Sequence, residues 1–439
     1  MKYKILLVTS DGFGAAMGDR LVREGNEVVM FTAEKEAHDI HKGILTQTDD
    51  YRKVLGAVDY CIFTNNKLVP IWKECVKVKP CYGGSEAGQK LEDDRLGAAK
   101  LAKSLGFKIP ESLGVKTVEE AERHLTSHKA KHVLKFTGGN TDSDDVLLGE
   151  YEDSRDLIRF CHFIEQSGKH WDSIEIQELI EGIEAGCSAY FDGQKWAPGI
   201  EINFQGKRFA SGEQGNGIGF LTGEMHTVIK YADESSPFFQ RTLGRMADHL
   251  REVGYKGEID AGCIVTPDGD YFIEWTPRTG IPDYMIRFPL QITPVGELFY
   301  GIATGDVKEN KIRPDWAIGA VILTPGFPDS KSSEKRTVGL PIIGYEGNEE
   351  NCHLIEARRG KDGLEMSDGG YGYCGVVTGR GPTVESARRN CYWIVKRANK
   401  KRVSVPKSWY RDDAGERVIE NKEEIIDLKI LTPEEWGDD

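Results

Sequence analysis

The sequence predicts a mixed α/β and α+β protein, and three observations carry this prediction. Its 439 residues are enough for about three domains. The first 64 residues alternate between strand and helix signals, which is typical of a doubly wound α/β unit. After Pro314 the pattern changes to strands separated by glycine turns, and between these regions residues 257–283 have the pattern of a β-hairpin with a polar exit.

The N-terminal region begins with a continuous apolar run at residues 3–9, typical of a buried parallel strand. Residues 26–32 and 58–64 predict two further strands, and a helix follows the turn at 10–18. Free backbone N–H groups at such a turn favour a phosphate or substrate contact, although a purely structural turn is equally compatible. Nicotinamide dinucleotide binding is disfavoured, because the third glycine of GFGAAMG comes one place late for the fingerprint.

The middle of the chain alternates between helix and strand patterns. Thr117 is a good N-cap for a helix over 118–127, and a long glycine-rich loop is expected at 207–225. The region after residue 420 is acidic and is expected to be exposed or partly disordered. The remaining predicted helices are 94–105, 154–167, 238–253 and 384–399, and the remaining strands are 132–136, 175–180, 186–192 and 195–203.

The hairpin at 257–283 places Glu274, Thr276 and Arg278 at alternate positions, hence on one face of a strand. A carboxylate, a hydroxyl and a guanidinium suit a metal-bound phosphate and a developing anion, whereas the alternative is a plain hairpin. If Asp268 and Gly269 centre a two-residue turn, Glu274 pairs with Cys263. Asp260 then lies on the opposite face unless a bulge shifts it, so we expect Glu274 and not Asp260 to hold the metal.

Composition excludes several classes of function. A net charge of −14 argues against a nucleic-acid grip over the surface. The nine cysteines show no CxxC spacing, which argues against a zinc site or a disulfide framework. Without a signal-peptide pattern or an 18-residue apolar run, we expect a cytoplasmic protein with no membrane partner. The sequence leaves a monomer or a homodimer open.

ATP-dependent acylation needs a cation for phosphates, a hinge for adenine, an acid for ribose and carboxylates for Mg²⁺. Lys135 lies inside an apolar strand, which is an uncommon core choice. The segment Glu178, Leu179 and Ile180 is a candidate hinge, and Glu184 follows one short turn later. Each residue alone also suits a solvated surface. Their order ahead of Glu274, over about 140 residues, is the informative feature.

Several segments in this order resemble the glycinamide ribonucleotide synthetase (phosphoribosylamine–glycine ligase) family of the ATP-grasp superfamily. The segment EIQELIEGIEAGCSAYFDG resembles the family's "EEFLxGEE" strand and hinge. KRFASGEQGNGIGFLTGEM resembles "HKR…GDGDxGPNTGGMG", and FIEWTPRTGIPD resembles "LEFNARFGDPE". Further matches are YGGSEAGQKLEDDRLGAAKLAKSLGFKIPES with the turn and helix ahead of "IPT", GGYGYCGVVTGRGPTVESARRNCYWIV with "GGRVLCVTALGxTLEEAxxxAY", and WYRDDAGERVI with "YRxDIGxRAI".

The resemblance implies an ATP-grasp fold with a Rossmann-like N-terminal domain at 1–105 and a β-rich C-terminal domain with one helix and an extended tail at 315–439. The ATP-grasp domain would span 106–314, divided into 106–180 and 181–314. The implied reaction, a step of purine biosynthesis, joins glycine to 5-phosphoribosylamine through an acyl phosphate and releases ADP. ATP and Mg²⁺, or Mn²⁺ in its place, are the implied cofactors.

The resemblance also assigns roles residue by residue. Glu274 and Arg278 would be catalytic, and Glu274 and Thr276 would hold the metal. The residues that would bind ATP are Lys135, Glu178, Leu179, Ile180 and Glu184. The residues that would contact the substrates, a small amino acid and a phosphorylated amine, are Asp11, Gly12, Gly14, Lys207, Arg208, Glu213, Gly280, Pro282 and Asp283.

Four departures from the family pattern keep two alternatives open. Thr276 replaces an asparagine of the metal pair, and the "GLAAGKGV" loop is replaced by residues 138–146, with three aspartates. "RFGDPE" loses one acid at Ile281, and the N-terminal turn lacks the family's arginine and histidine. A divergent ligase that joins an amino acid to another amine, such as a modified nucleotide, is therefore one alternative. A nucleotide-binding homologue without turnover is the other.

Overall fold

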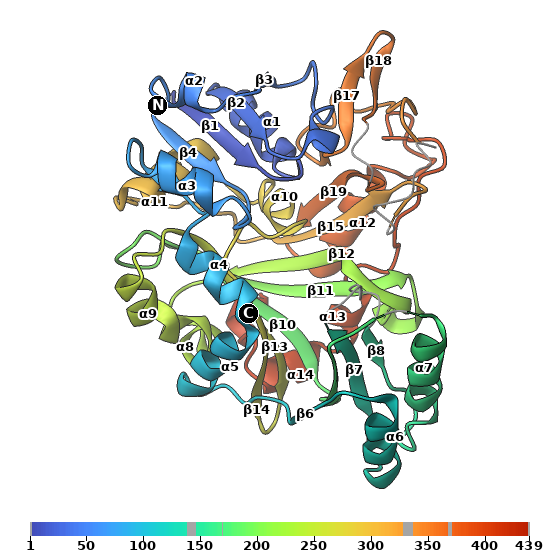
Figure 1. The fold of residues 1–439 in the computed structure, drawn as a ribbon. Helices are drawn as coiled ribbons and strands as arrows, with labels where there is room; N and C mark the ends of the chain where they lie inside the picture. The colour runs from blue at the N-terminus through green and yellow to red at the C-terminus, as the bar shows by residue number, and fades with distance from the viewer. Residues whose placement is uncertain (1, 138–145, 169, 328–336, 368–370, 438–439) are drawn as a thin grey trace.

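The computed structural model describes residues 2–137, 146–168, 170–327, 337–367 and 371–437. Within these residues the chain forms four β-sheets, as Figure 1 shows. The N-terminal sheet lies at the top of the view, a long sheet crosses the centre, and a smaller sheet stands at the lower right. The hairpin β17–β18 (Ala357–Gly360 and Gly363–Met366) is the fourth sheet and lies beside the N-terminal one.

The N-terminal sheet is parallel and has the order β3-β2-β1-β4-β5. Its central strand is buried along nearly its whole length, which explains the continuous apolar run in the sequence. The three strands predicted here are confirmed. The elements are β1 (Lys4–Thr9), β2 (Glu27–Thr32), β3 (Thr46–Thr48), β4 (Tyr60–Phe63) and β5 (Cys81–Tyr82), with α1 (Ala15–Arg23), α2 (Arg52–Leu55) and α3 (Val69–Cys75).

The smaller sheet is antiparallel, with the order β6-β9-β7-β8. Two helices cover it, and together they enclose a core of their own that includes Leu134, Leu157 and Ile176. Thr117 caps the first helix as predicted, because its hydroxyl accepts from the Glu120 amide at 3.2 Å. The elements are β6 (Ser112–Val115), β7 (His132–Thr137), β8 (Val146–Leu148), β9 (Ser173–Glu178), α6 (Val118–Ser127) and α7 (Arg155–Gln166), preceded by α4 (Glu86–Asp93) and α5 (Arg95–Ser104).

The central sheet has eight strands in the order β14-β13-β10-β11-β12-β15-β19-β16. It does not stop at residue 315, because β15 pairs with β12 and carries the sheet into the C-terminal region. The strands are β10 (Ile183–Phe191), β11 (Ile200–Ala210), β12 (Ile218–Ala232), β13 (Gly257–Thr266), β14 (Gly269–Thr276), β15 (Trp316–Leu323), β16 (Cys352–Leu354) and β19 (Tyr373–Gly381). The domain limits at 105 and 314 therefore stay a prediction, with one sheet crossing the second limit.

The C-terminal region contains more helix than predicted. Thr383 caps α12 (Val384–Trp393) through a capping box, as expected. The tail was expected to be extended and exposed, but it forms helices and buries Ile425, Ile430 and Leu431 in the core. The apolar residues of 425–431 are close together in the sequence, and the acidic composition of the tail as a whole masked this local signal. The helices are α13 (Glu416–Glu420), α14 (Lys422–Asp427) and α15 (Pro433–Trp436).

Two further predictions are wrong. Most of the expected loop at 207–225 is strand, since β11 runs to Ala210 and β12 begins at Ile218. Register shifts around Arg208 break the regular alternation, which explains why the pattern resembled a loop. The single helix expected at 238–253 is three short ones, α8 (Pro237–Arg241), a 3-10 turn at Leu243–Met246 and α9 (Ala247–Glu252). Thr242 interrupts it with a non-helical ψ of −104°.

The hairpin β13–β14 has a different register from the predicted one. Thr266 pairs with Gly269, so the turn is centred on Pro267 and Asp268. A bulge follows, and Glu274 pairs with Gly262 instead of Cys263. Asp260 pairs with Thr276 and therefore lies on the same face of the hairpin as Glu274. We expected Asp260 on the opposite face unless a bulge shifted it, and the structure contains that bulge.

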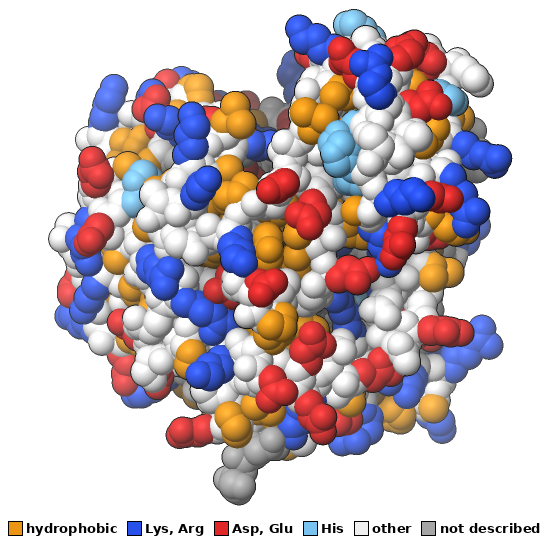
Figure 2. Space-filling model, turned by 90° about the horizontal axis from the view of Figure 1, so that it is seen from below, with side chains coloured by type: hydrophobic (Ala, Val, Ile, Leu, Met, Phe, Trp, Pro, Cys, Tyr) orange, Lys and Arg blue, Asp and Glu red, His pale blue; other side chains and the backbone are white. Residues whose placement is uncertain are grey.

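Acidic and basic side chains are interspersed over the face shown in Figure 2. All nine cysteines are buried and free. No helix in the described ranges combines the length and the hydrophobicity that crossing a membrane requires. The core is continuous across the central sheet, from α4 and α5 to the C-terminal helices.

Arg287, in α10 (Asp283–Arg287), makes a buried ion pair that supports the central sheet. It is 4% exposed, and its guanidinium contacts Glu201 on β11 and Glu258 on β13, the latter at 2.7 Å.

Because Arg287→Met leaves two buried carboxylates without their cation, we expect it to lower the free energy of unfolding by about 3–5 kcal/mol. Thermal or urea unfolding measures the loss. The control, Lys53→Met, breaks an exposed pair with Asp49 and should leave stability nearly unchanged. Equal effects would contradict the assignment.

Candidate active site

Lys207 on β11 connects two of the predicted site acids. Its Nζ lies 3.1 Å from Glu184 Oε1 on β10 and 3.6 Å from Glu274 Oε1 on β14. Register shifts around Arg208 take Lys207 out of the regular ladder, since Gly206 pairs with His226 and Arg208 with Leu221. A bulge redirects the side chain beside it, which is how a residue of β11 reaches across the sheet.

The acids around Lys207 determine its protonation. Burial alone would lower the pKa of its ammonium group, but the carboxylates of Glu184, Glu274 and Glu224 outweigh burial and raise the pKa well above its ordinary value. Lys207 is therefore charged at any physiological pH. The structure thus places one permanent cation among carboxylates from three different strands.

Lys135 on β7, in the smaller sheet, lies within electrostatic range of Glu274 on the central sheet. Its Nζ donates to Gln177 Oε1 at 2.8 Å. Burial lowers its pKa, while the nearby carboxylates of Glu175 and Glu274 act in the opposite direction. Lys135 and Glu274 are remote in sequence, yet the Glu274 carboxylate acts on the pKa of Lys135. A cleft between the two sheets is lined by Leu148 of the smaller sheet and by Glu184 and Lys207 of the central sheet, and Lys135 and Glu274 are not among its lining residues.

The predicted adenine hinge lies at the end of β9, between these sheets. The Glu178 amide donates to Glu111 O at 2.9 Å, and the Leu179 amide donates to Lys131 O at 3.1 Å. Neither N–H group is available to a base in this arrangement. Hydrogen bonding to adenine would then depend on Ile180 and on the carbonyl oxygens of the segment.

Arg278 is held by an acid that the sequence did not single out. Its Nε donates to Glu92 Oε1 at 2.8 Å, and the other oxygen of Glu92 accepts from Asn66 at 3.0 Å. Burial would lower the pKa of Arg278, but Glu92 raises it, with smaller contributions from Glu224 and Glu274. Arg278 therefore stays charged near Glu274, where the sequence placed it.

Glu224 and Asp283 form a close pair of carboxyl groups beside Lys207. Asp283 is 3% exposed, and its Oδ1 has no hydrogen-bond partner among the described residues. Glu224 accepts from the Thr227 hydroxyl at 2.9 Å. Burial and the Asp283 carboxyl raise the pKa of Glu224 well above its ordinary value, although Lys207 acts against this. The pair therefore holds a proton at pH values where an ordinary glutamate is ionised.

The other predicted substrate residues have mixed settings. Asp11 accepts from the Ser10 hydroxyl at 3.0 Å and from the Phe13 amide at 3.1 Å, so the turn binds its own carboxylate. Gly12 has a φ of 81°, and a Cβ on Gly14 would lie 2.6 Å from Thr64. Backbone conformation and close packing are therefore sufficient to explain the glycine at each of these two positions. Glu213 is exposed in the β11–β12 turn, the Gly280 amide donates to Glu258 at 3.0 Å, and Pro282 directly precedes α10.

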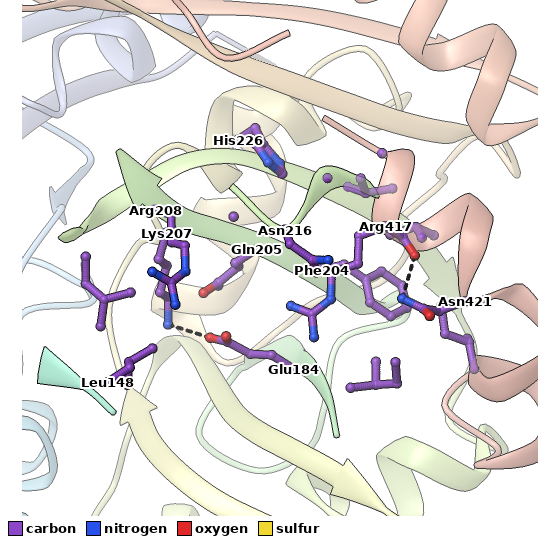
Figure 3. Close-up of a pocket in the computed structure, with 18 residues that line it drawn as sticks. Leu148, Glu184, Phe204, Gln205, Lys207, Arg208, Asn216, His226, Arg417 and Asn421 are labelled. Atoms are coloured by element: carbon purple, nitrogen blue, oxygen red, sulfur yellow. Dashed lines mark hydrogen bonds and ion pairs between the residues drawn. The ribbon is translucent and has the colours of Figure 1, made fainter. Parts of the chain in front are cut away.

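A cavity of about 330 Å³ opens beside Glu184 and Lys207, as Figure 3 shows. It lies between the central sheet, β8 and the helices α13 and α14, and its volume is in the range of small-molecule sites. Its apolar lining is Leu148, Ile183, Phe204, Leu221, Val228, Val418 and Ile425, and its polar lining includes Gln205, Arg208, Asn216, His226, Arg417 and Asn421. A planar apolar body with polar substituents fits this lining.

The oxygen atoms of Glu184, Glu274 and Thr276 suit a metal ion that takes its other ligands from a nucleotide. They do not suit a metal site formed by protein side chains alone. Within the described ranges, no three His, Cys, Asp or Glu side chains form a metal-binding group. Glu184 and Glu274 nevertheless converge on one cation, the Lys207 ammonium. Mg²⁺ in nucleotide enzymes commonly takes one or two carboxylates and completes its shell with phosphates and water. Glu274 suits that role, and Thr276, on the same face, offers a hydroxyl.

Sequence reasoning missed Gln177, Glu92, Glu224 and His226. Glu224 carried a signal, because it stands where the resembled pattern "NTGGMG" has its second glycine. Lys135 lies opposite Glu175 in the β7–β9 register, so Gln177 is its diagonal neighbour on β9, and this register could not be read from the sequence. Glu92 and His226 become site residues only through contacts between distant segments.

The raised pKa of Glu224 predicts a pH-dependent stability. In the folded state Glu224 keeps its proton above the pH at which the unfolded chain releases it, so the native state binds more protons and loses stability as pH rises. Glu224→Gln removes this loss, since the amide still accepts from Thr227. We therefore expect the Tm of the variant, relative to the natural protein, to increase from pH 5 to higher pH. Glu252→Gln, at an exposed position, is the control, and parallel Tm curves would contradict the assignment.

Comparison with known proteins agrees with this geometry. No family model matches the chain. A phosphoribosylamine–glycine ligase of Leptospira interrogans is 24% identical over 353 residues, which cover 77% of this chain and 78% of that protein. The solved phosphoribosylamine–glycine ligase of Thermotoga maritima aligns with a TM-score of 0.65 at 18% identity, over 93% of this chain and 99% of that one. A biotin carboxylase domain of a single-chain bacterial carboxylase aligns with a TM-score of 0.59 at 13% identity, over 97% of this chain and 99% of that one. The chain thus has an ATP-grasp fold, and its sequence is similar to those of the phosphoribosylamine–glycine ligases.

Proposed function

We propose that this chain is an ATP-dependent carboxylate–amine ligase, which forms an amide through an acyl phosphate and releases ADP. The relatives named phosphoribosylamine–glycine ligase support glycine and 5-phosphoribosylamine as its substrates. One observation carries the proposal. Glu184 and Glu274, the ribose acid and the metal acid of the resemblance, both contact the Lys207 ammonium group, and Glu274 is within electrostatic range of Lys135, which supports a shared site.

The cavity supports a place for the nucleotide. Its apolar lining, with Leu148, Ile183 and Val418, suits a purine base. Glu184, which lines the cavity, would bind the ribose hydroxyls, and the phosphates would then extend toward Lys135 and Glu274. Lys135 supplies charge to the phosphates, and Gln177 orients its ammonium group.

The reaction needs two transfers. A carboxylate oxygen attacks the γ-phosphorus of ATP and ADP leaves. The amine nitrogen then attacks the acyl carbon, phosphate leaves, and the amine loses a proton. Arg278, fixed by Glu92, would stabilise the negative charge that develops on the acyl oxygen. A divalent metal bound by Glu274 would neutralise phosphate charge, with Mg²⁺ the expected ion and Mn²⁺ a substitute.

One observation favours a second candidate for the amine. Residues 9–14 of the N-terminal turn contain no lysine or arginine, and the carboxylate of Asp11 lies within the turn. A carboxylate repels a phosphate at short range and attracts an ammonium group. An amino acid joined to an amine without a phosphate near this turn is therefore the second candidate, and the solved L-amino acid ligase of Bacillus licheniformis has a related fold, with a TM-score of 0.53.

The finer parts of the proposal concern location and assembly. Nine buried free thiols suit a reducing compartment, which supports a cytoplasmic enzyme. Small molecules are the proposed partners, and either a monomer or a homodimer is compatible with a site formed by one chain.

The test is ADP release with MgATP, measured with glycine or another amino acid and with phosphoribosylamine or an unphosphorylated amine. We expect release only when both an amino acid and an amine are present. Glu274→Gln should lower kcat by about 10²–10³-fold, because it removes charge where the metal-bound phosphates react. Glu252→Gln on the exposed side of α9 is the matched control. ADP release that no pair of substrates stimulates would refute the ligase assignment.

A further inference from the structure

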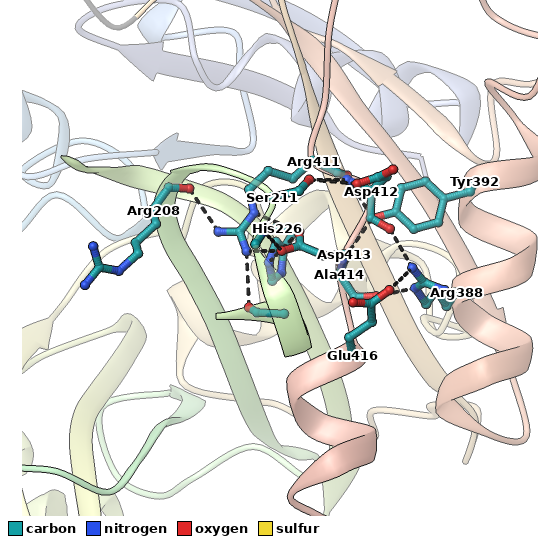
Figure 4. Close-up of polar contacts among 12 residues, drawn as sticks. Arg208, Ser211, His226, Arg388, Tyr392, Arg411, Asp412, Asp413, Ala414 and Glu416 are labelled. Atoms are coloured by element: carbon teal, nitrogen blue, oxygen red, sulfur yellow. Dashed lines mark hydrogen bonds and ion pairs between the residues drawn. The ribbon is translucent and has the colours of Figure 1, made fainter. Parts of the chain in front are cut away.

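Arg411, in the C-terminal tail, reaches into the turn between β11 and β12. It is 1% exposed, and Figure 4 shows its guanidinium among backbone and carboxylate acceptors. Nη1 donates to Arg208 O at 2.9 Å, and Nη2 donates to Gly215 O at 3.2 Å. Nε and Nη2 also donate to the two oxygens of Asp413 at 2.8 and 2.7 Å. A buried guanidinium with this many acceptors has one orientation available to it.

Asp413 binds the same turn from its other side. Its Oδ2 accepts from the Gly212 amide at 3.0 Å, and Arg411 lowers its pKa although burial acts in the opposite direction. Gly217, with a φ of 66°, permits the close approach, because a Cβ there would lie 2.7 Å from Arg411 Nη1. Arg411 and Asp413 together form what we call the tail clasp, which fixes the turn 211–217 at both ends.

His226 lies between the tail clasp and the cavity of Figure 3. It is 5% exposed, and neither ring nitrogen has a hydrogen-bond partner among the described residues. Its Nε2 is 3.9 Å from Asp413 Oδ1, which is too long for a hydrogen bond. Burial and the charge of Arg411 lower its pKa to about 3, so the imidazole is neutral. A buried, neutral ring without a partner beside a cavity is explained by a ligand that completes its hydrogen bonds.

The tail also forms the opposite wall of the cavity. Two residues of α13, Arg417 and Val418, line it directly after the tail clasp. Arg208, whose carbonyl Arg411 binds, lines it from β11 and follows Lys207 in the chain. The position of one buried arginine thus determines two walls of the cavity and the strand that carries Lys207.

We propose that Arg411 and Asp413 are positioning residues for nucleotide binding: the tail clasp holds the turn 211–217 and His226 where they receive the molecule in the cavity. This inference rests on the proposed function, which places ATP there. Neither residue of the tail clasp touches the ligand itself. His226 would contact it, as a neutral donor or acceptor.

A purely structural role for the tail is separable by a matched variant. Arg388 on α12 fixes the same tail, since it donates to Ala414 O at 3.0 Å and to Asp412 O at 2.6 Å, and it pairs with Glu416. Neither the β11–β12 turn nor the cavity lining includes Arg388. Arg388→Met therefore removes contacts of the tail that involve neither the two tail-clasp side chains nor the side chains that line the cavity.

The experiment compares Arg411→Lys, Asp413→Asn, His226→Phe and Arg388→Met in the full chain. For the first three we expect the KM for ATP, and the Kd for ADP measured by calorimetry, to rise about tenfold, with kcat changed less. Hydrogen exchange of the amides at 208–217 should accelerate in the two tail-clasp variants. Arg388→Met should leave KM, Kd and this exchange near those of the natural protein, even at an equal loss of Tm.

Equal changes in Kd for Arg388→Met and Arg411→Lys would overturn the proposal, as would faster exchange at 208–217 with an unchanged Kd. The ADP measurement needs no turnover. A natural protein that binds ADP but joins no pair of substrates would therefore refute the ligase assignment while still testing the tail clasp. If the natural protein is an active ligase but the tail-clasp variants bind ADP with an unchanged Kd, only the tail-clasp proposal is refuted.

Discussion

The ion pairs of Lys207 are the interaction on which the cleft depends. Glu184 and Glu274 come from β10 and β14, and without a cation between them their carboxylates would repel one another. The register shift that releases Lys207 from the ladder also places residues 222–225 in the unpaired stretch of β12 opposite it. One irregularity in the sheet therefore produces both the cation and an acid that accompanies it. Such an arrangement suits a charged ligand, because a phosphate group can replace a carboxylate as the partner of Lys207 and a metal ion can replace Lys207 as the partner of a carboxylate.

The continuity of the central sheet explains how a C-terminal tail becomes part of this cleft. Because β15 and β19 extend the sheet beyond β12, the C-terminal region is held in fixed orientation to β11 and β12 by backbone pairing. The helices α13 and α14 then pack against the same core as Ile183 and Val228. The smaller sheet carries Lys135, within electrostatic range of Glu274. The central sheet and the C-terminal helices thus share one core, whereas the smaller sheet has a separate core.

Strand and helix identity was largely predictable, and contacts between segments were not. The apolar run at 3–9 and the Thr117 cap are local signals, and both are confirmed. The predicted partner of Glu274 was wrong by one residue, because the turn lies one residue earlier than expected and a bulge then offsets part of that shift. Lys207 and Glu184 were both singled out, although their ion pair depends on a register shift that looked like a loop. Arg411 matches the arginine of the resembled pattern "YRxDIGxRAI", but that pattern does not reveal the two distant carbonyl groups to which its buried guanidinium donates.

Two differences from the family pattern together keep one acid in this region. The pattern "RFGDPE" loses its first acid at Ile281, while Glu224 appears where "NTGGMG" has a glycine. The structure places Glu224 against Asp283, so the acid is lost from one segment and gained beside the next. Such a pair destabilises the fold, because two buried carboxyl groups repel unless they share a proton. A structural role would be filled better by an apolar residue. Two carboxyl groups kept at this cost beside Lys207 and Arg278 argue for chemistry in the cleft, and against a homologue that has kept only the fold.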